Sequence, residues 1–202
     1  MKLYTMPGAC SLADHIVLHW SQLPFEVQVI SHENTKSPEY LKLNPAGSVP
    51  VLIDGDWALT QNSAILHYIA EIAPGAQLNG DGTPQGRAEV NRWLGLINAD
   101  LHPAYRPLFG GTRYLQDPDV IAKTQDSART KLREYYERID TQLRGRDWLT
   151  GKRSIADAYL FVTLLWARAL NVDLGGLDNL ERFSQSMLAD PGVIAAMKTE
   201  GL

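Results

Sequence analysis

The spacing of apolar residues along this 202-residue chain changes once from a mixed strand and helix pattern to a purely helical one, near residues 74–84. This change limits the fold more than any other feature. Before it, strand-like alternation and helix-like spacing take turns along the chain. The stretch itself is rich in Gly and Pro, which favours a domain boundary. After it, apolar residues recur only at intervals of three and four, as in Val90, Trp93, Leu94, Ile97 and Leu101. The sequence predicts a mixed α/β domain over residues 1–77, a linker over 78–84 and an all-helical domain over 85–202.

The first half of the chain shows a succession of strand and helix patterns. Leu3 and Tyr4 lie in a short strand-like run, a helical pattern follows over residues 11–22, and residues 25–30 alternate as a half-buried strand does. Strand, helix and strand in this order predict a right-handed parallel β-α-β unit. A polar segment with one short helix, a hairpin turned at Asp54-Gly55-Asp56 and a further helix complete the order β-α-β-α-β-β-α.

The second half contains clear helix starts. Asp117-Pro118 and Asp190-Pro191 each combine an N-cap acceptor with a proline suited to the first helical turn. Ser154 and Asp157 have the spacing of a capping box, in which two orphan backbone donors are satisfied reciprocally. The helix that follows, residues 155–170, is apolar almost all round. We expect it to be the central buried helix of this domain.

Composition excludes several classes of function. The net charge of −4 and the absence of a basic block argue against a nucleic-acid partner or an anionic membrane surface. No apolar run is long enough for a transmembrane helix, and no signal peptide is recognisable, so we expect a cytoplasmic protein without a membrane partner. A single cysteine excludes an internal disulfide, and the Cys and His spacing matches no zinc pattern. No metal is expected.

The only cysteine, Cys10, lies where the first strand gives way to the first helix. Pro7 and Gly8 turn the chain, and Ser11 opens the helical pattern. Backbone N–H groups at a helix start have no partner within the helix and carry partial positive charge, which favours a thiolate there. Cys10 is therefore a candidate nucleophile. The alternative is a small buried apolar residue between helix and sheet, since free cysteine is among the most buried side chains.

The chain contains four motifs, in the order Lys2-Leu-Tyr…Pro7-Gly-Ala-Cys-Ser-Leu12, Asn44-Pro-Ala-Gly-Ser-Val-Pro50, Leu59-Thr-Gln-Asn-Ser-Ala-Ile65 and Ser154-Ile-Ala-Asp-Ala-Tyr-Leu-Phe161. Together they resemble the cytosolic glutathione S-transferases, and the resemblance covers essentially the whole chain. Within that family the first motif is similar to the bacterial beta class, which uses a cysteine where other classes use Tyr or Ser. The resemblance implies a thioredoxin-like N-terminal domain, glutathione as co-substrate, a small hydrophobic electrophile as second substrate, and a homodimer.

The resemblance also implies roles for individual residues. Val49 and a cis Pro50 would offer backbone groups to the cysteinyl part of glutathione, in the manner of an added strand. His102 matches a histidine that faces the thiol and would hold or take its proton. The remaining candidates are Ser11 beside Cys10, Gln61 and Asn62 for the γ-glutamyl carboxylate, Lys36 or His32 for the glycyl carboxylate, and Tyr105 and Trp166 for the hydrophobic pocket.

Three positions depart from the beta-class pattern: Thr5 replaces a tyrosine, Gly95 an asparagine, and Pro103 a lysine. Pro103 also predicts a bend in its helix. These departures leave two alternative functions open. One is a protein that binds glutathione or another ligand without catalysis, and the other is a dehalogenase or isomerase with the same site. For a transferase, two sulfur mechanisms compete. Either the glutathione thiolate attacks the electrophile while Cys10 orients it, or Cys10 itself forms a mixed disulfide with glutathione. Because cysteine is a weak hydrogen-bond donor, the sequence favours the second mechanism.

Overall fold

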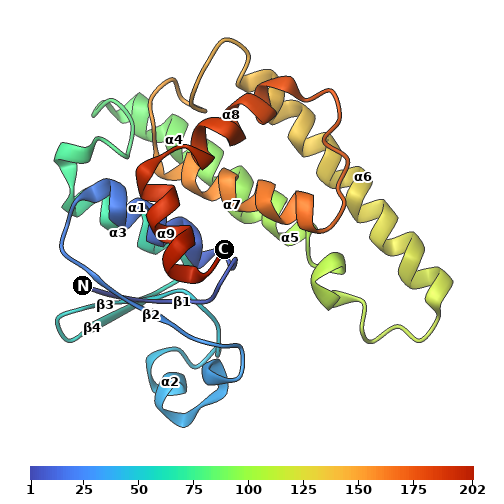
Figure 1. The fold of residues 1–202 in the computed structure, drawn as a ribbon, viewed down its shortest axis with the longest axis horizontal. Helices are drawn as coiled ribbons and strands as arrows, with labels where there is room; N and C mark the ends of the chain where they lie inside the picture. Colours follow the sequence, from blue (N-terminus) through green and yellow to red (C-terminus); the bar gives the residue numbers. More distant parts are fainter.

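The computed structural model describes all 202 residues and has two parts, a small sheet with its helices and a set of longer helices (Figure 1). The order β-α-β-α-β-β-α predicted for the first part is confirmed. Its elements are β1 (Lys2–Thr5), α1 (Ser11–Ser21), β2 (Glu26–Val29), α2 (Pro38–Leu43), β3 (Val51–Asp54), β4 (Trp57–Thr60) and α3 (Asn62–Ile72).

The second part is helical throughout, as predicted. Its two longest helices start at the expected caps, because Asp117 accepts backbone N–H bonds ahead of α6 and Asp157 closes the capping box of α7. The elements are α4 (Pro84–Leu96), α5 (His102–Ala104), α6 (Pro118–Gln142), α7 (Ile155–Ala169), α8 (Asp178–Leu188) and α9 (Pro191–Glu200). None of these or the other helices is both long and apolar enough to cross a membrane.

The sheet has the strand order β2-β1-β3-β4. β1 pairs in parallel with β2 and antiparallel with β3, and β3 forms the predicted hairpin with β4. In Figure 1, α1 and α3 lie on one face of the sheet and α2 lies on the other. α1 also packs against α7 and α9, so nearly all of its residues are buried. The first helix therefore connects the sheet to the helical part.

A single core runs through both parts of the molecule. Its buried residues come from the sheet, from α1 and α3, and from every long helix of the second part. Leu78, at the start of the predicted linker, belongs to this core, and its carbonyl accepts a hydrogen bond of 3.0 Å from the backbone N–H of Ile155. The linker is thus packed at its beginning. The domain limits at residues 77 and 85 stay a prediction.

The helix that starts at Pro84 does not continue regularly. A π-helical turn over Ile97–Leu101 separates α4 from the short α5, and a second one follows over Pro107–Gly111. Pro103 explains a break here, because proline has no N–H to donate to the preceding turn. The predicted bend near this proline is therefore present.

Candidate functional site

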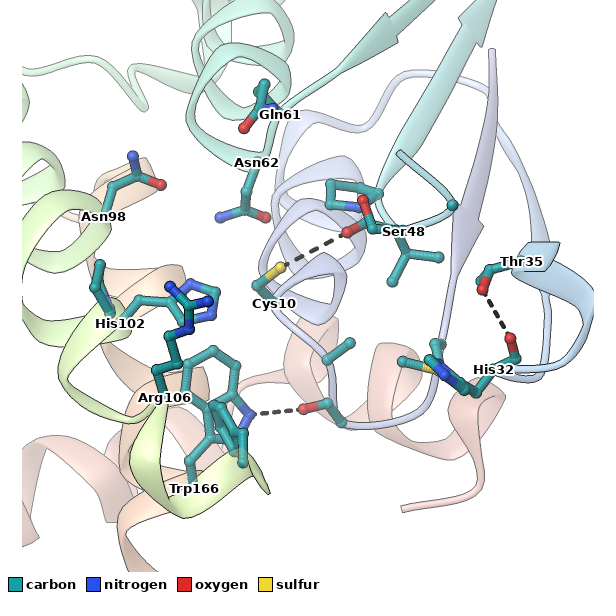
Figure 2. A pocket seen from close by; sticks show the side chains of 18 of the residues that line it. Cys10, His32, Thr35, Ser48, Gln61, Asn62, Asn98, His102, Arg106 and Trp166 are labelled. Atoms are coloured by element: carbon teal, nitrogen blue, oxygen red, sulfur yellow. Dashed lines mark hydrogen bonds between the residues drawn. The ribbon is translucent and has the colours of Figure 1, made fainter. Parts of the chain in front are cut away.

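A cavity of about 980 Å³ lies between the sheet and the helical part. One wall is formed by the β1–α1 loop, the segment before β3 and the start of α3. The other wall is formed by the irregular helix after α4 and by α7. Figure 2 shows the two walls, with Cys10 and Gln61 on the first and His102, Arg106 and Trp166 on the second.

The loop that carries Cys10 is held by both parts of the molecule. Gly8 has a φ of 69°, which a glycine adopts without strain, and this lets the chain turn into α1. Its N–H donates to Glu200 Oε2 on α9 at 3.3 Å, and its carbonyl accepts from Trp166 Nε1 on α7 at 2.7 Å. Both backbone groups of Gly8 therefore have partners in the helical part, which fixes the loop in front of the cavity.

Cys10 occupies the position before the first residue of α1 and lines the cavity. Its thiol donates to the carbonyl of Val49 across the groove, with 4.0 Å between sulfur and oxygen. The side chain is half-buried rather than sealed inside the core. Of the two interpretations of this cysteine, the structure thus supports a residue that faces a groove.

The expected bias of Cys10 towards thiolate is wrong. Burial raises the pKa of Cys10 from its ordinary value of 9.0 to about 12, and the carboxylate of Asp14 adds to the rise. Backbone N–H groups at the helix start act in the opposite direction, as expected, but they are weaker. The sequence argument counted only the helix end and left out the desolvation. At neutral pH Cys10 is a thiol.

The segment before β3 presents its backbone to the cavity. The bond between Val49 and Pro50 is cis, as the family resemblance implies. The preceding carbonyl, of Ser48, accepts from Tyr40 Oη at 2.8 Å and from Asn44 Nδ2 at 2.7 Å. This neighbouring carbonyl is therefore occupied by the protein's own donors, whereas the Val49 carbonyl has only the Cys10 thiol.

Lys36 does not line the cavity. Its ammonium donates to the carbonyl of Gly47 at 2.9 Å and so ties two parts of the same loop together. His32, the alternative from the sequence, does line the cavity, and Thr35 joins it from the same turn. The basic residue at this end of the groove is thus His32 rather than Lys36.

Gln61 and Asn62 both line the cavity at the start of α3. Gln61 is exposed and adopts a φ of 76°, a conformation that a residue with a side chain rarely takes. Asn62 is buried, and with its amide nitrogen as donor it binds the Cys10 carbonyl at 2.9 Å and Asp14 Oδ2 at 2.8 Å. Asn62 thus links the start of α3 to the cysteine loop.

His102 and Trp166 face the cavity from the helical part. His102 Nδ1 forms a hydrogen bond with Tyr159 Oη, and Tyr159 itself reaches the cavity from α7. Burial lowers the pKa of His102 from its ordinary 6.5, so the imidazole is neutral at pH 7. Its ring lies 4.7 Å from that of Trp166 between centroids. A neutral histidine and an aromatic surface thus oppose the thiol wall.

Two predicted site residues, Ser11 and Tyr105, lie behind the cavity walls. Ser11 is buried, with its Oγ 2.8 Å from Thr5 Oγ1. Thr5 Oγ1 in turn lies 2.8 Å from Glu200 Oε1, so this pair joins α1 to α9. Tyr105 is also buried, and its hydroxyl lies 2.6 Å from that of Tyr136 on α6. Both residues support the site without facing it.

Two residues of the helical wall, Asn98 and Arg106, were not predicted from the sequence. Both line the cavity together with His102. The three positions are spaced by four residues, which places side chains on one face of a helix. This spacing from His102 was the signal available in the sequence.

No group of His, Cys, Asp or Glu side chains in the structure could hold a metal ion.

Comparisons with known proteins agree with this architecture. The family models described as glutathione S-transferase, N-terminal domain, and glutathione S-transferase, C-terminal domain, match residues 1–71 and 100–191. A glutathione S-transferase of Xanthomonas campestris pv. campestris, GST-4.5, is 60% identical over the full length of both chains. The chain belongs to the glutathione S-transferase family.

Solved structures of glutathione S-transferases superpose on the whole chain. The enzyme from Xylella fastidiosa is 58% identical with a TM-score of 0.98, and the match covers 100% of this chain and 98% of that one. A sphingomonad glutathione S-transferase, solved in complex with glutathione, is 33% identical with a TM-score of 0.87 over the full length of both chains. The cavity described above is thus set in a complete glutathione S-transferase fold.

Proposed function

We propose that this protein is a glutathione transferase of the cysteine type, the bacterial beta class, which joins glutathione to an electrophile in the cavity between its two parts. The observation that carries the proposal is the opposition of Cys10 and the Val49 backbone across one groove, with 4.0 Å between Sγ and the carbonyl oxygen. The relatives that share the fold over its whole length bear the same activity in their names.

Glutathione would lie along the wall of the N-terminal part. Its cysteinyl unit would pair with the Val49 backbone, as an added strand does. The γ-glutamyl carboxylate would meet Gln61 and the N–H groups at the start of α3, where the helix end favours an anion. The glycyl carboxylate would meet His32 and Thr35 at the other end of the groove. This arrangement brings the thiol of glutathione to Cys10.

In this proposal Cys10 stays protonated and glutathione supplies the nucleophile. A thiol whose pKa is raised to about 12 is a donor at neutral pH, and its S–H would stabilise the thiolate of glutathione. The neutral imidazole of His102 would accept the proton that the glutathione thiol loses. The thiolate then attacks the electrophilic carbon, a C–S bond forms, and the leaving group departs with its electron pair.

A conjugation assay with glutathione and chlorodinitrobenzene tests the proposal directly. Wild-type protein should form the conjugate with release of chloride, and Cys10→Ala should lower kcat/KM by about 10-fold or more, the effect of removing one donor to a developing anion. Retention on immobilised glutathione without turnover of any electrophile, disulfide or peroxide would contradict the enzyme and favour a ligand-binding protein.

Thiol exchange through Cys10 is the second candidate, and the open path from the cavity to the sulfur favours it. In that reaction the Cys10 thiol loses its proton to solvent and its thiolate attacks glutathione disulfide; an S–S bond forms between Sγ and one glutathione, the S–S bond of the disulfide breaks, and the other glutathione leaves as thiolate. Because the chain has one cysteine, intact-mass measurement after incubation with glutathione disulfide gives an unambiguous answer. An adduct of the mass of one glutathione supports exchange, and an unchanged mass excludes it.

The resemblance also leads us to propose a homodimer, in which the first helices of the two helical domains pack across a two-fold axis. Light scattering after size-exclusion chromatography separates the two states, because the monomer has a mass of 22.4 kDa. A mass of twice this value supports the dimer, and the monomer mass contradicts it.

A further inference from the structure

The cavity lining carries one charged side chain, and its charge is positive. The lining residues include Arg106 and no Lys, Asp or Glu. The chain as a whole has a net charge of −4, so the charge in the cavity is opposite in sign to the net charge of the protein. A cleft with one sign of charge raises the local concentration of ligands of the other sign. The cavity is therefore suited to anionic molecules.

Arg106 carries a permanent positive charge, and its side chain has no partner in the chain. Its guanidinium makes no ion pair and no hydrogen bond. Several other arginines in the helical part do pair with carboxylates, for example Arg129 with Asp126 at 2.9 Å and Arg168 with Glu181 at 2.8 Å. The planar guanidinium matches a carboxylate with two parallel hydrogen bonds. Arg106 thus offers a free carboxylate-binding group inside the cavity.

The position of Arg106 separates it from the proposed glutathione groove. The groups assigned to the two carboxylates of glutathione belong to the N-terminal wall, at Gln61 and at His32. Arg106 lies one helical step of four residues after His102, on the opposite wall, and Figure 2 shows its guanidinium directed into the cavity from that wall. This is the side from which the second substrate must approach the sulfur.

Aromatic side chains accompany this cation. Phe109 is 47% exposed, and its ring lies 5.2 Å from that of Trp166 at an angle of 86°. Both residues line the cavity, as does Pro103. An apolar ring of a substrate can therefore pack on this wall while an anionic group on the same molecule reaches the guanidinium.

We propose that Arg106 binds the carboxylate of the second substrate, so that the enzyme prefers electrophiles that combine an apolar or aromatic body with a carboxylate. The inference rests on the proposed transferase function and refines its substrate, which the sequence describes only as hydrophobic. Arg106 determines specificity in this proposal and takes no part in the transfer of electrons or protons.

The test compares two electrophiles that share one chloronitrobenzene ring, one with a negative charge and one without: a chloronitrobenzoate with chlorine para to the carboxylate, and the methyl ester of the same acid. Because the two differ in intrinsic reactivity, each variant is compared with the wild-type protein on the same substrate. In both, the glutathione thiolate forms the C–S bond, chloride leaves with the electron pair of the C–Cl bond, and the thiol proton passes by way of His102 to the buffer. Arg106→Gln should lower kcat/KM for the acid by about 10- to 100-fold, since hydrogen bonds to charged groups contribute about 1.5–3 kcal/mol. For the ester it should change kcat/KM by less than about 3-fold.

Two further variants complete the experiment. Arg138→Gln removes the same charge from the exposed surface of α6, outside the cavity, and should leave both substrates unaffected. Arg106→Lys should restore part of the rate with the acid, because it keeps the charge but loses the paired geometry. An equal loss for acid and ester in Arg106→Gln would overturn the inference. So would a raised KM for glutathione with both electrophiles, which would assign Arg106 to glutathione. Wild-type protein that converts neither electrophile refutes the transferase function instead.

Discussion

The raised pKa of Cys10 predicts that this thiol resists alkylation at neutral pH. With an ordinary value of 9.0, about 3% of a cysteine is thiolate at pH 7.5, whereas a pKa of about 12 leaves about 0.003%, a difference of about 1,000-fold. Thiolate is the reactive form, so the rate constant with iodoacetamide should fall below that of free cysteine by about this factor. Burial is the larger cause of the raised pKa, and the charge of Asp14 is the second cause.

Intact-mass measurement follows the reaction without peptide mapping, because Cys10 is the only cysteine. The logarithm of the rate should rise by about one for each pH unit up to about pH 10 and show no plateau. Asp14→Asn should make the reaction faster at each pH, because it removes the second cause and leaves the first. A plateau below pH 9 in the wild-type protein, or a rate close to that of free cysteine, would refute the reasoning.

Three further predictions concern stability and pH. Asp157→Ala should lower the free energy of unfolding in urea by about 3 kcal/mol, because it leaves the buried N–H groups of Leu149 and Ser154 unpaired. The exposed control Asp126→Ala should change the free energy of unfolding by about 0.5 kcal/mol or less. Equal effects of the two substitutions would contradict this role of Asp157. Glu200→Ala should also cost about 3 kcal/mol, since Gly8, Thr5 and His15 lose a shared buried partner, and an unchanged urea midpoint would speak against it. Because the pKa of His102 is lowered, kcat/KM of conjugation should fall with acid only below pH 6.5. His102→Gln should remove this acidic limb of the pH–rate profile. A limb centred above pH 7 would contradict a neutral histidine.

The fold could be predicted from the sequence because its determinants are local. The period of the apolar residues sets strand or helix, and the caps at Asp117, Ser154 and Asp190 lie within one turn of the helices that they start. The irregular stretch after α4 was predicted only as a bend at Pro103. The first π-helical turn packs against α7 and the second against α6, and spacing alone does not describe such packing.

The site was predictable in its outline and less so in its electrostatics. Helix starts placed Cys10, Gln61 and Asn62 at one cavity, as the resemblance implies. The predicted charge state of Cys10 was wrong, because its desolvation and its closeness to the carboxylate of Asp14 result from tertiary packing. Which face of a helix meets a cavity also depends on packing, and for this reason Tyr105 lies behind the wall while Arg106, one residue later, lies on it.

The glutathione thiol provides the most direct test of the central claim that Cys10 acts as a donor to a bound thiolate. The ultraviolet absorption of thiolate, titrated against pH with glutathione bound, gives the pKa of that thiol in wild-type protein and in Cys10→Ala. The claim predicts a pKa well below that of free glutathione in the wild type, and a rise of about one pH unit or more in the variant, which corresponds to about 1.4 kcal/mol of lost stabilisation. The same pKa in both proteins would contradict it.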